Sequence, residues 1–283
     1  MANFIQQLAL VSDTPGVSFG EASLVAAALD KQATRDFAPI WGINASIHAF
    51  ESLDDVPLGY WPMVIRDDIG FDGAAGIHLD QDGQPFALIT GGDGWSLTAS
   101  HESLEMLADP FGNRLIAGPS IKTGQGRVNY LVEVSDPSEA SEFGYTVNDL
   151  VMSDFYTPAF FDPVTASGVR YSFTGALTKP REVLKGGYLS WHEPVTDMWW
   201  QATFFGAKLT FRNLGRIDAS KGSLRSQIDA KSGRDSIKFM QPKRNLLLTA
   251  AAKRTTSGNR SSCSRATSLR AQIEVLRKAA NKK

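Results

Sequence analysis

The chain has 283 residues, 42% of them apolar and 21% charged, which fits an ordinary soluble globular protein of one large domain or two modest ones. No stretch reaches the roughly 18 consecutive apolar residues of a membrane span, and a single cysteine, Cys263, excludes a disulfide framework within the chain. The net charge of −1 hides a split, because residues 1–211 hold 11 basic and 26 acidic residues, whereas residues 212–283 hold 18 basic and 4 acidic ones.

The first predicted element is an amphipathic helix over residues 18–36, with Leu24 and Leu29 on its apolar stripe. Pro39 is expected to limit its end. Short apolar or alternating runs between turn residues then predict four strands. These strands cover residues 43–50, 61–66, 75–79 and 85–90.

A second helix is predicted from about Ser96 to Ala108, after the break Gly91–Gly94. Ser96 or Thr98 is the expected cap. The predicted order is therefore helix, four strands, helix. It forms an N-terminal lobe of about residues 1–112.

A less regular C-terminal lobe is expected over about residues 113–212, which completes a globular domain of residues 1–212. Its best strand candidates are Val128–Val134, Gly144–Val151 and Val169–Phe173. Residues 186–212 are rich in tryptophan and phenylalanine, and we expect them to pack this lobe onto the first.

From about Asn213 the pattern decays into Ser, Lys, Arg and Ala. We expect residues 213–283 to be a basic tail, disordered or weakly helical, with a short helix over 269–280. Its charge allows nonspecific contact with nucleic acid. The start of the chain lacks the basic and apolar segments of a secretory signal, so with its one cysteine the protein is expected to be cytoplasmic.

The second helix carries the pattern that points to chemistry, His101-Glu102-Ser103-Leu104-Glu105. Residues four apart lie on one face of a helix, so His101, Glu105 and Asp109 form a row of potential metal ligands. Leu104 shares this side, and an ionised carboxylate on an apolar face is costly unless it is paired or binds a metal. A divalent cation is therefore predicted at this helix.

This segment resembles the HExxH helix of zincin metallopeptidases, with Glu105 in place of the second histidine. The order of helix, small sheet and metal helix over residues 18–110 is also similar to a zincin N-terminal lobe. The resemblance implies an α+β, zincin-like fold with a small mixed sheet. It also implies that the strand at Pro85–Thr90 is the sheet edge that holds extended peptide substrates.

Carried over to this chain, the resemblance makes His101 the first zinc ligand, Glu105 the second and Glu102 the general base. Oxygen ligation by Glu105 is compatible with Zn²⁺ and admits other divalent metals. The third ligand stays open between Asp109 and the pair Glu133 and Asp136.

Other histidines are interpreted differently. His192 and Glu193 are a weaker option for the metal. His48 and His78, both on predicted strands, are interpreted as structural histidines.

Three functional hypotheses follow. The first is a zinc-dependent hydrolase, a peptidase that acts on peptide or protein substrates. The second is a catalytically inactive zincin-like binding protein that uses its cleft for recognition. The third makes the basic tail the working part, as a nucleic-acid-binding segment regulated by the acidic domain.

Overall fold

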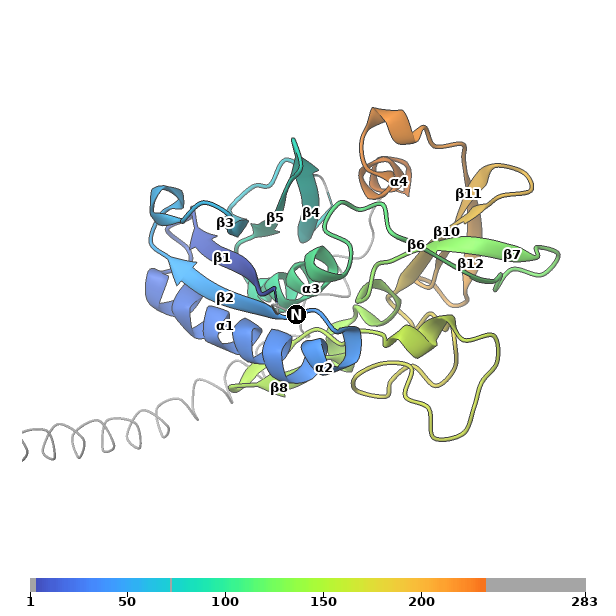
Figure 1. Ribbon diagram of the computed structural model, residues 1–283, viewed down its shortest axis with the longest axis horizontal. Coiled ribbons are helices and arrows are strands. Elements are labelled where there is room, and N and C mark those ends of the chain that lie inside the picture. The colour runs from blue at the N-terminus through green and yellow to red at the C-terminus, as the bar shows by residue number, and fades with distance from the viewer. Residues whose placement is uncertain (1–3, 72, 233–283) are drawn as a thin grey trace, which may run out of the picture. The chain divides into compact units, whose positions relative to one another are not determined.

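The computed structural model describes residues 4–71 and 73–232, all within one compact unit, Met1–Pro242 (Figure 1). The fold is mixed α+β, as expected, with two five-stranded sheets and one two-stranded sheet. One hydrophobic cluster includes residues of both the N-terminal and C-terminal halves, from Leu8 on the first strand to Trp191. None of the helices in the described ranges is long and apolar enough to cross a bilayer.

The N-terminal sheet has the strand order β2-β1-β3-β5-β4. All neighbouring strands run parallel except β4, which is antiparallel to β5. Its strands are β1 (Gln6–Ser12), β2 (Ala45–Phe50), β3 (Trp61–Arg66), β4 (Gly76–Gln81) and β5 (Gln84–Thr90). Strand β1 was not predicted, because its residues Leu8–Val11 are buried on both faces and show no alternation.

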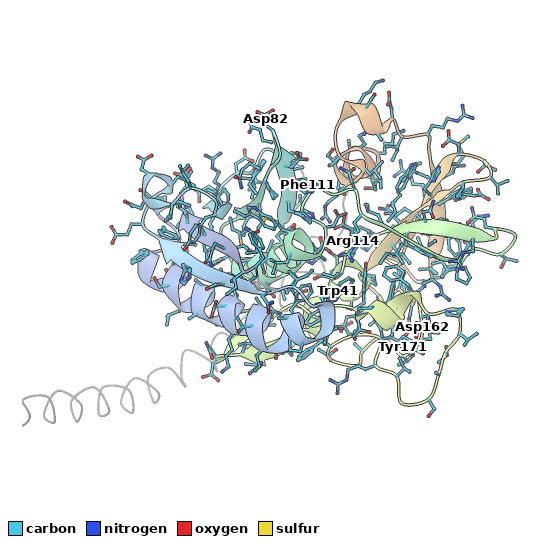
Figure 2. The ribbon with its side chains drawn as sticks, viewed as in Figure 1. Trp41, Asp82, Phe111, Arg114, Asp162 and Tyr171 are labelled. Carbon is cyan, nitrogen blue, oxygen red and sulfur yellow. The ribbon has the colours of Figure 1, made fainter. Side chains whose placement is uncertain are left out.

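The edge strand next to the helix predicted at Ser96–Ala108 is β4, which corrects the expectation that Pro85–Thr90 is the edge strand. Strands β4 and β5 form a hairpin through Asp82 and Gly83, whose φ angles are 53° and 80°. Two left-handed residues match the twist of a tight hairpin, and Asp82 marks its tip in Figure 2. The hairpin therefore folds β4 to the outside and leaves β5 paired on both sides.

The first helix is longer than predicted. Helix α1 (Phe19–Lys31) begins with a capping box between Ser18 and Glu21. It continues through a π-helical segment, η1 (Gln32–Phe37), into the short helix α2 (Ala38–Trp41). Pro39 does not end the helix, because it lies in the first turn of α2, where a missing N–H costs little.

Helix α3 (Trp95–Ala108) matches the second predicted helix, but its N-cap is Gly94, with a φ of 85° and no side-chain cap. Neither Ser96 nor Thr98 caps it. Helix α3 packs on β4 and β5 and contacts α1, so both helices cover the same face of the N-terminal sheet. All its residues from Leu97 to Ala108 are buried, and the segment His101–Glu105 therefore lies inside the protein.

The C-terminal sheet is an antiparallel arrangement of order β12-β11-β10-β7-β6. Its strands are β6 (Leu115–Pro119), β7 (Arg127–Leu131), β10 (Tyr188–Glu193), β11 (Met198–Thr203) and β12 (Thr210–Gly215). The aromatic-rich segment supplies the last three strands.

The other two strands predicted in this half differ from the structure. The strand expected over 144–151 is a hairpin of β8 (Tyr145–Val147) and β9 (Leu150–Met152). Asn148 and Asp149 both have positive φ and form its turn. The strand expected over 169–173 is reduced to a single bridge between Tyr156 and Ser172.

The expected boundary between residues 212 and 213 falls inside β12. The chain continues into a short 3-10 turn, η6 (Ala219–Lys221), and helix α4 (Leu224–Ser232). Leu224 and Ile228 are buried against Trp199 and Leu214, so two well-placed apolar residues join this polar segment to the C-terminal sheet. The rest of the expected tail, residues 233–283, and the helix predicted over 269–280 lie outside the described residues.

Candidate metal centre

Helix α3 holds His101 and Glu105 one turn apart on one buried face. Their side chains are 3% and 0% exposed, and His101 Nε2 lies 3.3 Å from Glu105 Oε1. The helix is anchored from behind by Ser100, whose hydroxyl donates to Gln32 Oε1 and accepts from the backbone N–H of Ser153. Helical geometry and this polar anchor together fix the direction in which both ligand candidates point.

Asp136 completes a group of three. It lies in the short 3-10 turn η3 (Asp136–Ser138) after β7, and its Oδ1 is 3.2 Å from His101 Nε2. The ligand atoms of His101, Glu105 and Asp136 all lie within 4.8 Å of one another. Ligands about 2.0–2.1 Å from a tetrahedral zinc ion are about 3.3 Å apart, so the two shortest separations fit such an ion.

The charges of this group shift its pKa values in opposite directions. Burial alone would lower the pKa of His101, but Glu105, together with Asp136, raises it well above its usual range. Burial and the charge of Glu105 raise the pKa of Asp136. Burial would also raise the pKa of Glu105, but His101 and Arg225 hold it below its usual range. The group is therefore an acidic site that only positive charge makes tolerable.

Arg225 of α4 supplies part of that positive charge from the far end of the described chain. Its Nη1 donates to Glu105 Oε2 at 2.6 Å and also forms an ion pair with Glu133. Arg225 and both carboxylates are almost completely buried. Because Arg225 binds Oε2, Glu105 presents its other oxygen, Oε1, to His101.

Glu102 points to a second group. Its Oε2 lies 3.5 Å from His78 Nδ1 on β4, and Glu105 Oε2 lies 3.8 Å from the same nitrogen. Burial would raise the pKa of Glu102, but the adjacent His78 side chain and the charge of Arg225 lower it. Gly76 leaves room for this carboxylate, since a Cβ there would lie 2.8 Å from Glu102 Oε1. Glu102 is therefore ionised and only 3% exposed.

Asp109, expected as a possible ligand, closes the C-terminal end of α3 instead. Its two carboxylate oxygens accept from the backbone N–H groups of Asn113 and Arg114, at 3.0 and 2.8 Å. Arg114, labelled with Trp41 in Figure 2, donates to the Ala108 carbonyl and lies over the Trp41 ring. Asp109 belongs to neither group of converging ligand atoms.

The remaining candidates lie elsewhere. Glu133 binds Arg225 and is in neither group, so of the two downstream acids only Asp136 joins His101. On β10, His192 pairs with Asp197, and Glu193 accepts from Thr196 and Trp200.

Sequence reasoning missed the roles of His78 and Arg225. His78 carried a weak signal, a histidine between Ile77 and Leu79 in an apolar run, but it was interpreted as structural. Arg225 gave none beyond its place beside Leu224, because its segment is uniformly polar and basic.

Tyr156 brings a hydroxyl to the same buried region. Burial, followed by the charges of Glu105 and Asp136, raises its pKa well above the usual value. Its hydroxyl has no hydrogen-bond partner among the described residues. By contrast, the Tyr145 hydroxyl accepts from Gln32 Nε2 and donates to Asp36.

Comparison with known proteins adds no assignment. No known protein family matches the chain, and no curated protein and no solved structure resembles it at a significant level.

Proposed function

We propose that the protein is a metal-dependent hydrolase, with peptides as its substrates and a divalent ion held by His101, Glu105 and Asp136. One observation carries this proposal: three ligand atoms from two separate elements converge in a buried place at separations suited to a metal ion. Zn²⁺ is the first choice, since histidine and carboxylate ligands suit it, and other divalent ions remain compatible.

The order of elements supports a zincin-like assignment. After strand β1, the helix that begins with α1, four further strands of the mixed sheet with one antiparallel edge strand, and then α3 follow one another in the N-terminal half. Edge strand β4 runs beside α3 and takes the place that the resemblance gave to Pro85–Thr90. An extended peptide added to that edge would lie next to Glu102.

In this proposal, the ion, Glu102 and Tyr156 have separate roles in hydrolysis. When bound, the ion would polarise the scissile carbonyl and favour ionisation of a water molecule. Glu102 takes the proton from the attacking water and delivers it to the leaving amine. Tyr156, whose hydroxyl is free to donate, stabilises negative charge on the carbonyl oxygen.

The test is metal analysis of the purified protein, together with cleavage of a peptide library. We expect at least one zinc ion per chain in the wild type and fewer in His101→Ala, which loses the ion held by His101, Glu105 and Asp136, with cleavage only by the wild type. His48→Ala, on the edge strand β2, is the matched control and keeps the ion. Equal, sub-stoichiometric metal in the wild type and in His101→Ala would contradict the proposal.

A second function is a metal-stabilised binding domain without catalysis. It is favoured by burial, because Glu102 and the three ligand candidates are each 3% exposed or less. Structural metal sites are closed in this way, whereas catalytic sites keep an open position. If the wild type binds metal but cleaves no peptide, and Glu102→Gln changes nothing, this second function is the correct one.

A further inference from the structure

His78 points from β4 at two carboxylates of α3. Its Nδ1 faces Glu102 Oε2 and Glu105 Oε2, at 3.5 and 3.8 Å. The His78 side chain is fully buried, and Nδ1 has no hydrogen-bond partner within residues 4–71 and 73–232. Three potential ligand atoms from two elements thus converge in a second group, which shares only Glu105 with the group around His101.

The other nitrogen of His78 determines which tautomer is present. Nε2 lies 3.0 Å from the backbone carbonyl oxygen of Asp109. A carbonyl only accepts, so Nε2 carries the hydrogen, and in its neutral form the ring presents a lone pair at Nδ1. Metal-binding histidines are commonly held in this way, with the second nitrogen bound to a carbonyl. A lone pair opposite two carboxylates is repulsive unless a cation lies between them.

The local charge leaves room for such a cation. Glu102, Glu105, Glu133 and Asp136 are all buried. In the described ranges, Arg225 is the one arginine or lysine that forms salt bridges with this group. Among the described residues of this group, buried carboxylates outnumber the one guanidinium that pairs with them, so a divalent cation between them is favourable.

We propose that His78, Glu102 and Glu105 form a second site for a divalent cation, which shares Glu105 with the first. Glu105 Oε1 faces His101, and Oε2 faces His78. One nitrogen and two carboxylate oxygens suit zinc and neighbouring transition metals. Arg225 donates to the same Oε2, and this positive charge makes the second site weaker than the first.

The second site gives the metal a regulatory role, which rests on the proposed function. An ion there engages Glu102, so Glu102 no longer accepts the proton of the attacking water. Losing a general base slows hydrolysis roughly 10²-fold or more. The protein is therefore active with one ion and inhibited with two.

The experiment titrates the metal-free full chain with Zn²⁺ and counts bound ions by equilibrium dialysis. We expect the wild type to bind two ions, the second more weakly, and His78→Gln and Glu102→Gln to bind one. Glutamine at position 78 keeps an N–H donor for the Asp109 carbonyl, and the retained first ion reports that each variant is folded. His192→Gln is the control for an unrelated histidine and binds two.

Peptide cleavage provides the second measurement. In the wild type it rises with the first ion and falls as the second binds, whereas in His78→Gln the fall is absent. A wild type that saturates at one ion overturns the second site and leaves the proposed function intact. A wild type that binds none overturns both.

Two further outcomes concern the variants. If His78→Gln still binds two ions, the site is not at His78. If His78→Gln binds none, the number of ions bound by Glu102→Gln is decisive. Two ions bound by Glu102→Gln would overturn the proposal.

Discussion

Arg225→Met is expected to be one of the most destabilising single substitutions in this protein, although Arg225 lies in a segment whose composition is typical of a polar tail. Methionine keeps much of the length of the side chain and removes the charge. Glu105 and Glu133 are then left without the guanidinium that binds both.

The magnitude follows from burial. The Arg225 side chain is 3% exposed and the two carboxylates are 0% and 6% exposed, so solvent screens the pairs little. Removing one partner of a buried ion pair typically costs about 3–5 kcal/mol, because an uncompensated charge remains inside. By contrast, the exposed pair Arg216–Asp197 is expected to contribute at most about 1 kcal/mol.

The assay is urea denaturation of the metal-free protein, with Arg216→Met as the matched control. We expect the free energy of unfolding to fall by about 3–5 kcal/mol for Arg225→Met and by less than about 1 kcal/mol for Arg216→Met. In a Glu133→Gln background, Arg225→Met should cost about 1–3 kcal/mol less, since one of the three carboxylates that pair with Arg225 is gone.

Equal, small losses for the two arginine variants would refute this reasoning. They would mean that α4 does not hold Arg225 in the acidic interior. If Arg225→Met lowers the free energy of unfolding by the same amount with and without Glu133→Gln, the arginine stabilises the protein through packing of its aliphatic part and not through its charge.

Three further predictions concern single residues. Gly76→Ala puts a Cβ 2.8 Å from Glu102 Oε1, so we expect the free energy of unfolding, measured by thermal denaturation, to fall by about 1–3 kcal/mol. Gly126→Ala is the control and should change stability little, because a Cβ there meets nothing within 4 Å. Ser18→Ala removes the side-chain cap of α1 and should cost about 1 kcal/mol in urea; no measurable change would mean that the cap is frayed in solution. Burial raises the pKa of Tyr145, so its neutral form stabilises the fold below the ordinary tyrosine pKa and the benefit is lost as pH rises beyond about 10. Tyr145→Phe should therefore lose less stability than the wild type between about pH 9 and 11, and parallel pH profiles of the two proteins would contradict this.

Local periodicity was sufficient for much of the N-terminal half. The helix at residues 96–108 and the strands at 61–66 and 85–90 lie within a residue or so of their predicted bounds. Their signals are short-range, since each depends on apolar spacing and on turn residues close by. Strand β1 and the pairing of β4 outside β5 were missed, because burial on both faces and strand order depend on distant partners.

The C-terminal boundary failed for a related reason. The composition after residue 212 has few large apolar residues, and it was interpreted as a tail. Leu224, Ile228 and Arg225 are the side chains of α4 that are buried against the rest of the protein. Composition is an average over a segment, so it does not reveal that three of its side chains pack against distant parts of the protein.

The sequence by itself determined that His101 and Glu105 share a helix face, because the helical repeat brings residues four apart into register. It also placed acidic groups on an apolar stripe, which required a source of positive charge. Only the tertiary structure decided which groups join them: Asp136 rather than Asp109 or Glu133, with His78 and Arg225 in addition. These residues are separated by up to 120 positions from Glu105, and only the packing of β4, η3 and α4 around α3 brings them together.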